Sequence, residues 1–223
     1  MRSRPEDPDL RARLVAAAIR LLAEGGPEAL QARPLVAEAG TSTMAVYTRF
    51  GGMPGVVEAV AEEGFRLLAA RLDAVPETAD PVADIFGLAL GYRQAALDNP
   101  HLYGVMFGLT APAGRRVPTV QVTAGTPQLG QRAFERLTGA VRRAYDAGRF
   151  HVGEPSSAAA QLWSGLHGFI TLELAGYFGA EDDSLAQVLA PLGANLAVGL
   201  GDDLESAAAS SLAGAGAWLR ENR

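Results

Sequence analysis

Apolar residues recur along this chain at the three- and four-residue spacing of amphipathic helices, with almost no alternating, strand-like stretch. In the stretch 7–26, Leu10, Leu14 and Leu21 fall on one helical face, which is the pattern of a helix packed against a core. The one β-branched patch, 117–125, is short and contains a proline. The pattern predicts an all-α fold with helices in the stretches 7–26, 34–39, 43–49, 53–75, 82–99, 100–108, 126–148, 155–179, 184–201 and 204–220.

The order of these helices predicts the domain organisation. Three helices, the last two of them short, precede one long helix, and Gly25 and Gly26 mark the end of the first. We expect a small three-helix unit over residues 1–52, a connecting helix over 53–74 and an all-helical body over 75–223. Within that body, residues 109–126 are rich in Gly, Pro and Thr and are expected to form a loop.

Composition excludes several classes of function. The chain has no cysteine, so it can hold no disulfide, thiolate metal site or cysteine nucleophile. Its three histidines, His101, His151 and His167, are scattered and lack the spacing of metal ligands. No nucleophile–base pair is evident. We therefore expect neither an enzyme nor a metal or cofactor site.

Hydropathy and charge place the chain in the cytoplasm and leave a nucleic-acid partner open. No run of about 18 uncharged apolar residues occurs, and the N-terminus is too polar for a signal peptide, so no membrane contact is expected. The net charge is −6, and 48% of the residues are hydrophobic. The charge is uneven, because residues 1–50 carry a net +1 and the remainder a net −7. The first fifty residues are therefore less acidic than the body.

The segment 39–52, AGTSTMAVYTRFGG, has the composition of a turn followed by a short helix. Gly40 suits the turn, Ser42 is placed to cap the second helix, and Val46 falls at a spacing that packs inward with Leu35. Two short helices joined by a glycine-containing turn make the helix-turn-helix arrangement. The other interpretation is a helical corner that binds nothing. The residues that would face base edges in the DNA major groove are Thr43, Met44 and Ala45.

The segments LLAEGGPEAL and ARPLVAEAGTSTMAVYTRFGG, with the long helix after them, match one known pattern without a gap. On these motifs the first part of the chain resembles the tetracycline-repressor family of transcriptional regulators. The resemblance implies double-stranded operator DNA as a partner. It also implies roles for individual residues: bases face Thr43, Met44, Ala45 and Thr48, phosphates face Arg33, Ser42 and Tyr47, and Val46 and Phe50 lie in the core.

The chain departs from the family pattern where the connecting helix begins. Met53 stands where members usually have a lysine, so one phosphate-binding charge is missing, although backbone amides at that helix start remain available. We expect weaker DNA binding as a result. Arg2 and Arg4 either supplement it by reaching a groove or belong to a disordered tail that makes no contact. The other departures are at Gln31, Pro34, Val36 and Thr41.

The C-terminal half offers a surface for a homodimer. The segments 155–179 and 184–201 hold between them one carboxylate, Glu173. Helices that are apolar on nearly all sides are central to a core or shared with another subunit. Because one recognition helix reads only a few base pairs, helix-turn-helix modules dimerise. We expect a four-helix interface with two helices from each chain, as is usual in the family that the chain resembles.

The segments LGYRQAALDNPHLYGVMFG and LWSGLHGFITLELAG resemble a C-terminal subclass of the same family, named for its Trp-His-Gly segment. This resemblance implies a domain that senses a small-molecule effector, with a pocket between the long helix and those after it. His167 could contact the effector or sense pH, or it could be satisfied by a backbone carbonyl. The candidate ligand-binding residues, for which a plain core is the other interpretation, are Phe65, Tyr92, Tyr103, Met106, Phe107, Phe134, Leu137, Trp163 and His167.

These observations favour a ligand-responsive repressor that binds palindromic operator DNA as a homodimer and is released by a small, mostly apolar molecule. Release requires that the effector bind the two states of the protein with different affinity. The alternative is a dimeric helical small-molecule-binding protein with weak or lost DNA binding. Salt dependence separates the two hypotheses, because phosphate contacts make affinity for DNA fall steeply with added salt.

Overall fold

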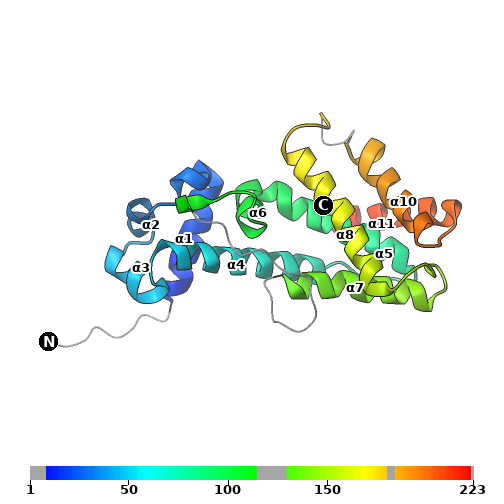
Figure 1. The fold of residues 1–223 in the computed structure, drawn as a ribbon, viewed down its shortest axis with the longest axis horizontal. Helices are drawn as coiled ribbons and strands as arrows, with labels where there is room; N and C mark the ends of the chain where they lie inside the picture. Colours follow the sequence, from blue (N-terminus) through cyan, green and yellow to red (C-terminus); the bar gives the residue numbers. More distant parts are fainter. Residues whose placement is uncertain (1–8, 115–129, 180–183, 222–223) are drawn as a thin grey trace. The chain divides into compact units, whose positions relative to one another are not determined.

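The computed structural model describes residues 9–114, 130–179 and 184–221 (Figure 1). Arg2, Arg4 and most of the predicted loop 109–126 lie outside the described residues. Every regular element in the described ranges is a helix, which confirms the all-α prediction. The chain divides into two compact units. Unit 1 comprises residues 1–67 and 99–130, and unit 2 comprises residues 68–98 and 131–223.

Unit 1 consists of short helices packed around a longer first helix. That helix ends where the sequence predicts, at Gly26 with φ 69°. Asn99 begins a later helix by accepting a hydrogen bond from the backbone N–H of Leu102 at 2.9 Å, as a capping residue does. The elements are α1 (Leu10–Gly25), η1 (Pro27–Ala29), α2 (Ala32–Glu38), α3 (Thr43–Phe50), α4 (Met53–Asp73) as far as Leu67, α6 (Pro100–Met106) and η2 (Pro112–Gly114).

The core of unit 1 is built from the apolar face of α1. Leu14 and Leu22 are fully buried on it, and α1 contacts both α2 and α6. Leu35 of α2 and Val46 of α3 are also buried, as their spacing predicts. The removal of this apolar surface from water is what holds the short helices in place. Others buried in this core are Ala17, Ala18, Val56, Val57 and Val60.

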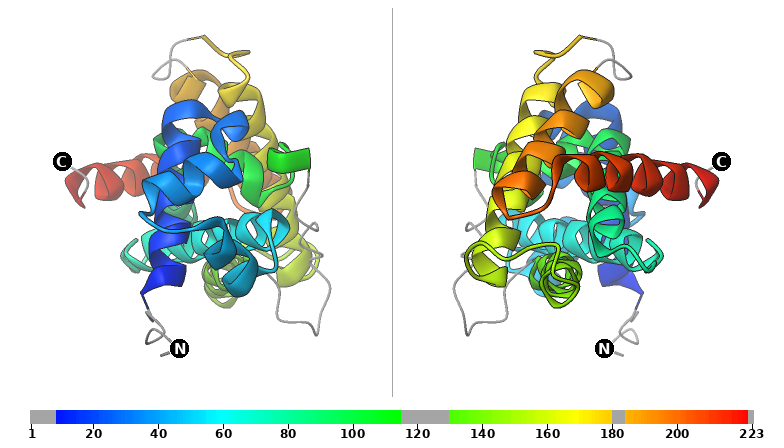
Figure 2. Two further views of the ribbon diagram at one scale, coloured as in Figure 1. Left: turned by 90° about the vertical axis from the view of Figure 1, so that its left-hand side faces the viewer. Right: turned by 90° about the vertical axis from the view of Figure 1, so that its right-hand side faces the viewer.

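Unit 2 is a helical bundle with α5 at its centre. The buried α5 packs against α7, α8 and α11, and α8 and α10 lie side by side (Figures 1 and 2). The chain enters this unit through the last residues of α4, so that one continuous helix has residues in both units. The further elements are α5 (Pro81–Asp98), α7 (Gln131–Asp146), α8 (Pro155–Leu174), η3 (Leu185–Leu189), α10 (Ala190–Gly199) and α11 (Leu204–Glu221).

The predicted helix over 184–201 differs from the observed one in its first turn. Directly after Ser184, the residues Leu185–Leu189 form the π-helical turn η3, and the helix α10 begins at Ala190. Pro191 explains the difference, because it has no N–H to donate and its ring crowds the carbonyl four residues earlier. In the described part of the chain, no helix combines the length and apolar character needed to cross a lipid bilayer.

Candidate functional site

The helix pair α2–α3 is joined by a tight turn at Gly40. Gly40 has a φ of 62°, a backbone conformation that glycine adopts without steric cost. Its N–H donates to the carbonyl of Ala37 at 3.2 Å, and the N–H of Thr41 donates to the carbonyl of Val36 at 2.9 Å. These two bonds satisfy carbonyls at the end of α2. The turn therefore has the helix-turn-helix geometry that the sequence predicts.

Ser42 occupies the N-cap position of α3, but its side chain makes no capping hydrogen bond. The sequence-based expectation of a hydroxyl cap is wrong on this point. The physical reason lies in the backbone, where the N–H of Ala45 donates to the carbonyl of Ser42 at 3.0 Å. That N–H is one that a capping hydroxyl would otherwise accept from. Ser42 remains exposed.

The outward face of α3 carries two large exposed side chains. Met44 is 70% exposed and Tyr47 is 65% exposed, whereas the intervening Val46 is 1% exposed. Thr48 is also exposed, and its hydroxyl donates to the carbonyl of Met44 at 2.9 Å within the helix. The other predicted contact residues are Arg33 and Thr43, which are exposed, and Ala45, which is partly buried.

Two arginines of α1 lie close to carboxylates of other helices in unit 1. Arg20 pairs with Glu38 of α2 at 2.8 Å. Arg11 lies 3.7 Å from Glu62 and also stacks over the ring of Phe50, 5.1 Å from its centroid. Phe50, predicted to lie in the core, is only partly buried, and the Arg11 guanidinium covers one face of its ring. The outward face of α3 thus offers hydroxyl, apolar and aromatic groups more than charge.

Gly55, in the first turn of α4, is a residue that sequence reasoning missed. A Cβ at this position would lie 2.0 Å from the carbonyl oxygen of Phe50, far inside any allowed contact distance. Only glycine permits α4 to begin this close to the end of α3. The signal was present in the stretch MPGVV, where glycine interrupts an otherwise good helical sequence.

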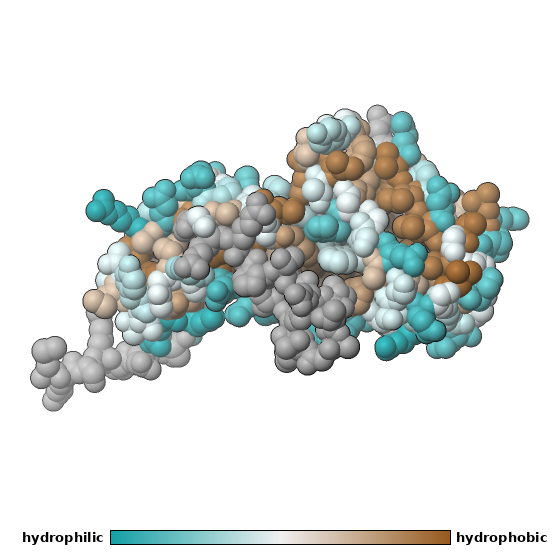
Figure 3. All heavy atoms as spheres, viewed as in Figure 1, coloured by the Kyte–Doolittle hydropathy of each residue, from teal (hydrophilic) through white to brown (hydrophobic). Residues whose placement is uncertain are grey.

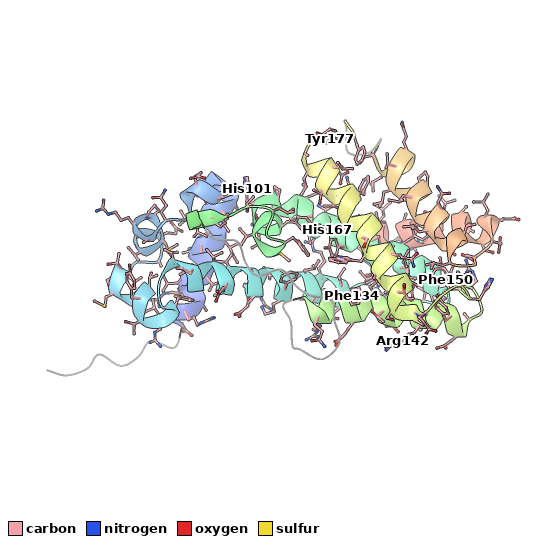
Figure 4. The ribbon with its side chains drawn as sticks, in the orientation of Figure 1. His101, Phe134, Arg142, Phe150, His167 and Tyr177 are labelled. Carbon is pink, nitrogen blue, oxygen red and sulfur yellow. The ribbon has the colours of Figure 1, made fainter. Side chains whose placement is uncertain are left out.

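Five of the nine candidate ligand-binding residues lie in unit 2. The indole N–H of Trp163 donates to the hydroxyl of Tyr92 at 3.2 Å. The ring of Trp163 lies 5.5 Å from that of His167 and 6.3 Å from that of Phe134, measured between centroids. Figure 4 shows Phe134 on α7 and His167 on α8. Leu137 lies one turn after Phe134 on α7 and is partly buried.

The environment of His167 favours its neutral form. Burial lowers the pKa of His167 below its ordinary value of 6.5, because desolvation penalises the imidazolium. A neutral imidazole both donates and accepts a hydrogen bond. We call the group formed by Tyr92, Phe134, Leu137, Trp163 and His167 the Trp163 cluster. Its polar atoms are the Tyr92 hydroxyl, the Trp163 N–H and the His167 imidazole.

The other four candidates lie together in unit 1. The Phe65 and Phe107 rings meet edge to face at 5.2 Å, and the Tyr103 ring lies 4.7 Å from that of Phe107. Met106 packs against Gly64, where a Cβ would lie 2.7 Å from the methionine sulfur. Phe65, Tyr103 and Met106 are buried, and Phe107 is partly buried. This set has the close packing of a core.

Unit 2 also contains a buried ion pair that was not predicted from the sequence. Arg93 of α5 donates to both carboxylate oxygens of Glu173 on α8, at 2.8 and 2.7 Å. Their side chains are only 6% and 7% exposed. The hydroxyl of Ser184 donates to the same carboxylate. The sequence signal for this pair was a single carboxylate, Glu173, in an apolar segment. A buried charge needs a partner, but the sequence alone does not identify which residue that partner is.

A second network ties the loop after α4 to the rest of unit 2. Arg143 of α7 donates to Asp84 of α5 at 2.6 Å, and Arg136 of α7 donates to the carbonyl of Val75 at 2.8 Å. Arg149 forms a bidentate ion pair with the buried Asp202, at 2.6 and 2.7 Å.

No group of histidine and carboxylate side chains among the described residues is arranged to hold a metal ion.

Comparisons with known proteins agree with this geometry. Residues 14–60 match the family described as "Bacterial regulatory proteins, tetR family", and residues 85–192 match "Tetracyclin repressor-like, C-terminal domain". No curated protein matches the chain.

Solved structures share the fold. A protein of unknown function from Rhodococcus sp. RHA1 is 26% identical, with 90% of this chain and 100% of that chain covered and a TM-score of 0.69. RolR in complex with resorcinol is 21% identical, covering 91% and 93%, with a TM-score of 0.65. The candidate regulatory protein SCO4313 is 30% identical, covering 84% and 95%, with a TM-score of 0.62. The chain belongs to the tetR family of bacterial regulatory proteins, which are DNA-binding transcription regulators and not enzymes.

Proposed function

We propose that this protein is a ligand-responsive repressor that binds palindromic operator DNA as a homodimer and leaves it when a small, mostly apolar molecule binds. The observation that carries the proposal is the α2–α3 pair, in which a buried inner face supports an outer face of exposed Met44 and Tyr47. In helix-turn-helix modules the second helix lies in the major groove. We assign residues 1–52 to DNA binding, residues 53–74 to a connecting helix, and residues 75–223 to effector binding and dimerisation.

The contacts with DNA divide by chemistry. Thr43, Met44, Ala45 and Thr48 occupy the first two turns of α3 and are assigned to base edges. Arg33, Ser42 and Tyr47 are assigned to phosphates, which fix the register of the helix on the duplex without reading sequence. Support for Arg33 comes from its exposure at the start of α2.

The dimer is assigned to α8 and α10. Leu172 of α8 is 44% exposed and Val198 of α10 is 39% exposed, and apolar side chains gather over these two helices in Figure 3. The only carboxylate of α8, Glu173, is satisfied internally by Arg93, so it leaves no unpaired charge on this surface. An apolar surface made of two adjacent helices is what a four-helix interface requires.

The effector is assigned to the Trp163 cluster of unit 2. The four candidates of unit 1, Phe65, Tyr103, Met106 and Phe107, pack closely with one another and stay predictions. Trp163, His167, Phe134 and Leu137 are only partly buried although they are aromatic or apolar, as expected of side chains that line a ligand site. The Trp163 and His167-Gly168 positions also support assignment of this domain to the Trp-His-Gly subclass. RolR, which shares the fold, binds resorcinol, an aromatic molecule with hydroxyl groups that would suit such a cluster.

The salt dependence of DNA binding tests this function. Duplexes are selected from a random-sequence pool at low salt, and the affinity for a selected duplex is measured at increasing salt. The logarithm of affinity should fall linearly with the logarithm of salt concentration, and Arg33→Ala should make the slope shallower by about 0.9 for each phosphate that the variant no longer binds. In a dimer in which each copy of Arg33 binds one phosphate, the slope should change by about 1.8.

The matched control is Arg142→Ala, which removes the same charge from an exposed position on α7 (Figure 4). It should leave the slope unchanged. If no duplex is selected at any salt concentration, the alternative of a dimeric small-molecule-binding protein that has lost DNA binding replaces the repressor.

A further inference from the structure

We infer that α3 recognises thymine, through the 5-methyl groups that an operator presents in the major groove. The inference rests on the proposed function, in which α3 enters that groove, and it names the base that α3 reads there. It follows from the side chains that the outward face of α3 presents and from those that it lacks.

The bases other than thymine are read by side chains that α3 does not offer. Guanine is read by arginine or lysine, adenine by asparagine or glutamine, and cytosine by a carboxylate. None of these residue types occurs from Thr43 to Thr48. Arg49 is the one charged residue of α3, but it lies in the last turn of the helix, and its side chain is not free. Base-reading residues lie at the N-terminal end of a recognition helix.

The hydroxyl groups on this face do not supply the missing specificity. The Thr48 hydroxyl donates its proton to the carbonyl of Met44 at 2.9 Å, so it approaches a base only as an acceptor or with its methyl group. The Thr43 hydroxyl is exposed, but a hydroxyl both donates and accepts and therefore distinguishes bases poorly.

Apolar contact is the base-specific interaction that remains. Met44, which carries a flexible thioether, is 70% exposed, and Ala45, the next residue in the first turn of α3, is partly buried. Thymine is the only base whose major-groove edge carries a methyl group. An apolar side chain that is this exposed in the free protein gains by covering that methyl group.

Deoxyuridine substitution tests this directly, because it removes the methyl group and leaves base pairing intact. Duplexes are first selected from a random-sequence pool by the full-length protein, and each thymine of a selected duplex is then replaced in turn by deoxyuridine. Replacement at one or two positions in each half-site should weaken binding about fourfold per methyl group. Replacement elsewhere should have no effect.

The variant Met44→Ala should lose the effect at one of these positions, so that thymine and deoxyuridine bind equally there. Leu212→Ala is the matched control. It shortens a side chain on α11 that is 77% exposed, and it should retain full sensitivity to deoxyuridine. Both substituted residues are exposed, so the helix content of each variant should equal that of the wild type.

Two other outcomes overturn the inference. If a selected duplex binds equally well with every thymine replaced by deoxyuridine, α3 does not read thymine methyl groups, and the repressor function stands without this specificity. If no duplex is selected at low salt, the proposed function and the inference fail together.

Discussion

Val46 and Tyr47 are consecutive residues, yet Val46 is buried and Tyr47 is exposed, with exposed fractions of 1% and 65%. A helix turns by about 100° per residue, so consecutive side chains point to different faces. In a helix as short as α3, this makes the inner face responsible for stability and the outer face available for recognition. Substitutions at Met44 or Tyr47 should therefore change binding with an effect on stability of about 0.5 kcal/mol or less.

His167 should make stability depend on pH. Because burial lowers its pKa below 6.5 in the folded state, the unfolded chain binds the proton at a higher pH than the folded protein does. Its contribution to the free energy of unfolding is therefore full above about 6.5 and is lost as the pH falls toward the lower folded pKa. His167→Phe should reduce the loss of stability between about pH 7.5 and 5.5. Urea unfolding at both pH values measures this, and equal losses in variant and wild type would contradict it.

Residues in and around α3 also show what a sequence can and cannot predict at this scale. The inward positions of Leu35 and Val46 were predictable from spacing, because helical geometry alone decides them. The absence of a capping bond from the Ser42 side chain was not, because the N–H of Ala45 donates to the backbone carbonyl of Ser42 instead. The glycine at position 55 was visible in the sequence as a break in a helical stretch, but its cause, the carbonyl of Phe50 at the end of the preceding helix, was not.

At the scale of elements, the pair between Arg93 and Glu173 joins α5 to the end of α8 across 80 residues of sequence. Both charges are removed from water, so each depends on the other for solvation. The hydroxyl of Ser184 brings the start of η3 to the same carboxylate. One buried carboxylate therefore joins α5, the end of α8 and the start of η3, including one end of the surface assigned to the dimer.

Substitution of Glu173 should lower the free energy of unfolding by more than the buried area of its side chain suggests. Glu173→Gln leaves the guanidinium of Arg93 buried without a counter-charge, and the free energy of unfolding should fall by about 3–5 kcal/mol. Ser184→Ala removes one hydrogen bond and should cost about 1 kcal/mol. Urea unfolding monitored by circular dichroism measures both. Replacing Arg93 and Glu173 together by methionine should recover much of the loss, and equal costs for the single and double variants would contradict the account.

Helix positions were largely predictable at this scale, and their partners were not. Apolar periodicity and glycine or proline signals located α1, α3 and α5 to within a few residues, because these signals are local. The π-helical turn η3 was not predicted, because the sequence around it is otherwise typical of an α-helix and only Pro191 marks the difference. The pairing of Arg93 with Glu173, and of Arg149 with Asp202, depends on tertiary contacts that a single sequence does not encode in any local pattern.

At the scale of the whole molecule, the proposed function requires a second copy of the chain. One copy of α3 spans too few base pairs to select a site in a genome, and two copies in fixed register multiply the specificity. The surface over α8 and α10 is assigned to that contact (Figure 3), whereas α11 presents a second set of exposed apolar residues, among them Leu204 and Leu212. Which surface forms the dimer can be decided by introducing a charge into each.

Leu172→Arg should convert the dimer into a monomer. Leu172 is 44% exposed in the isolated chain, so arginine there should leave the fold intact, but in a two-fold interface the charge is buried twice. An unpaired buried charge costs several kcal/mol, so dimerisation should weaken at least about 100-fold. Size-exclusion chromatography with light scattering measures the mass, and the monomer should also lose affinity for selected duplexes. Leu212→Arg on α11 is the control and should remain dimeric, because α11 lies outside the assigned interface. If Leu212→Arg is a monomer and Leu172→Arg a dimer, the interface lies on α11 instead.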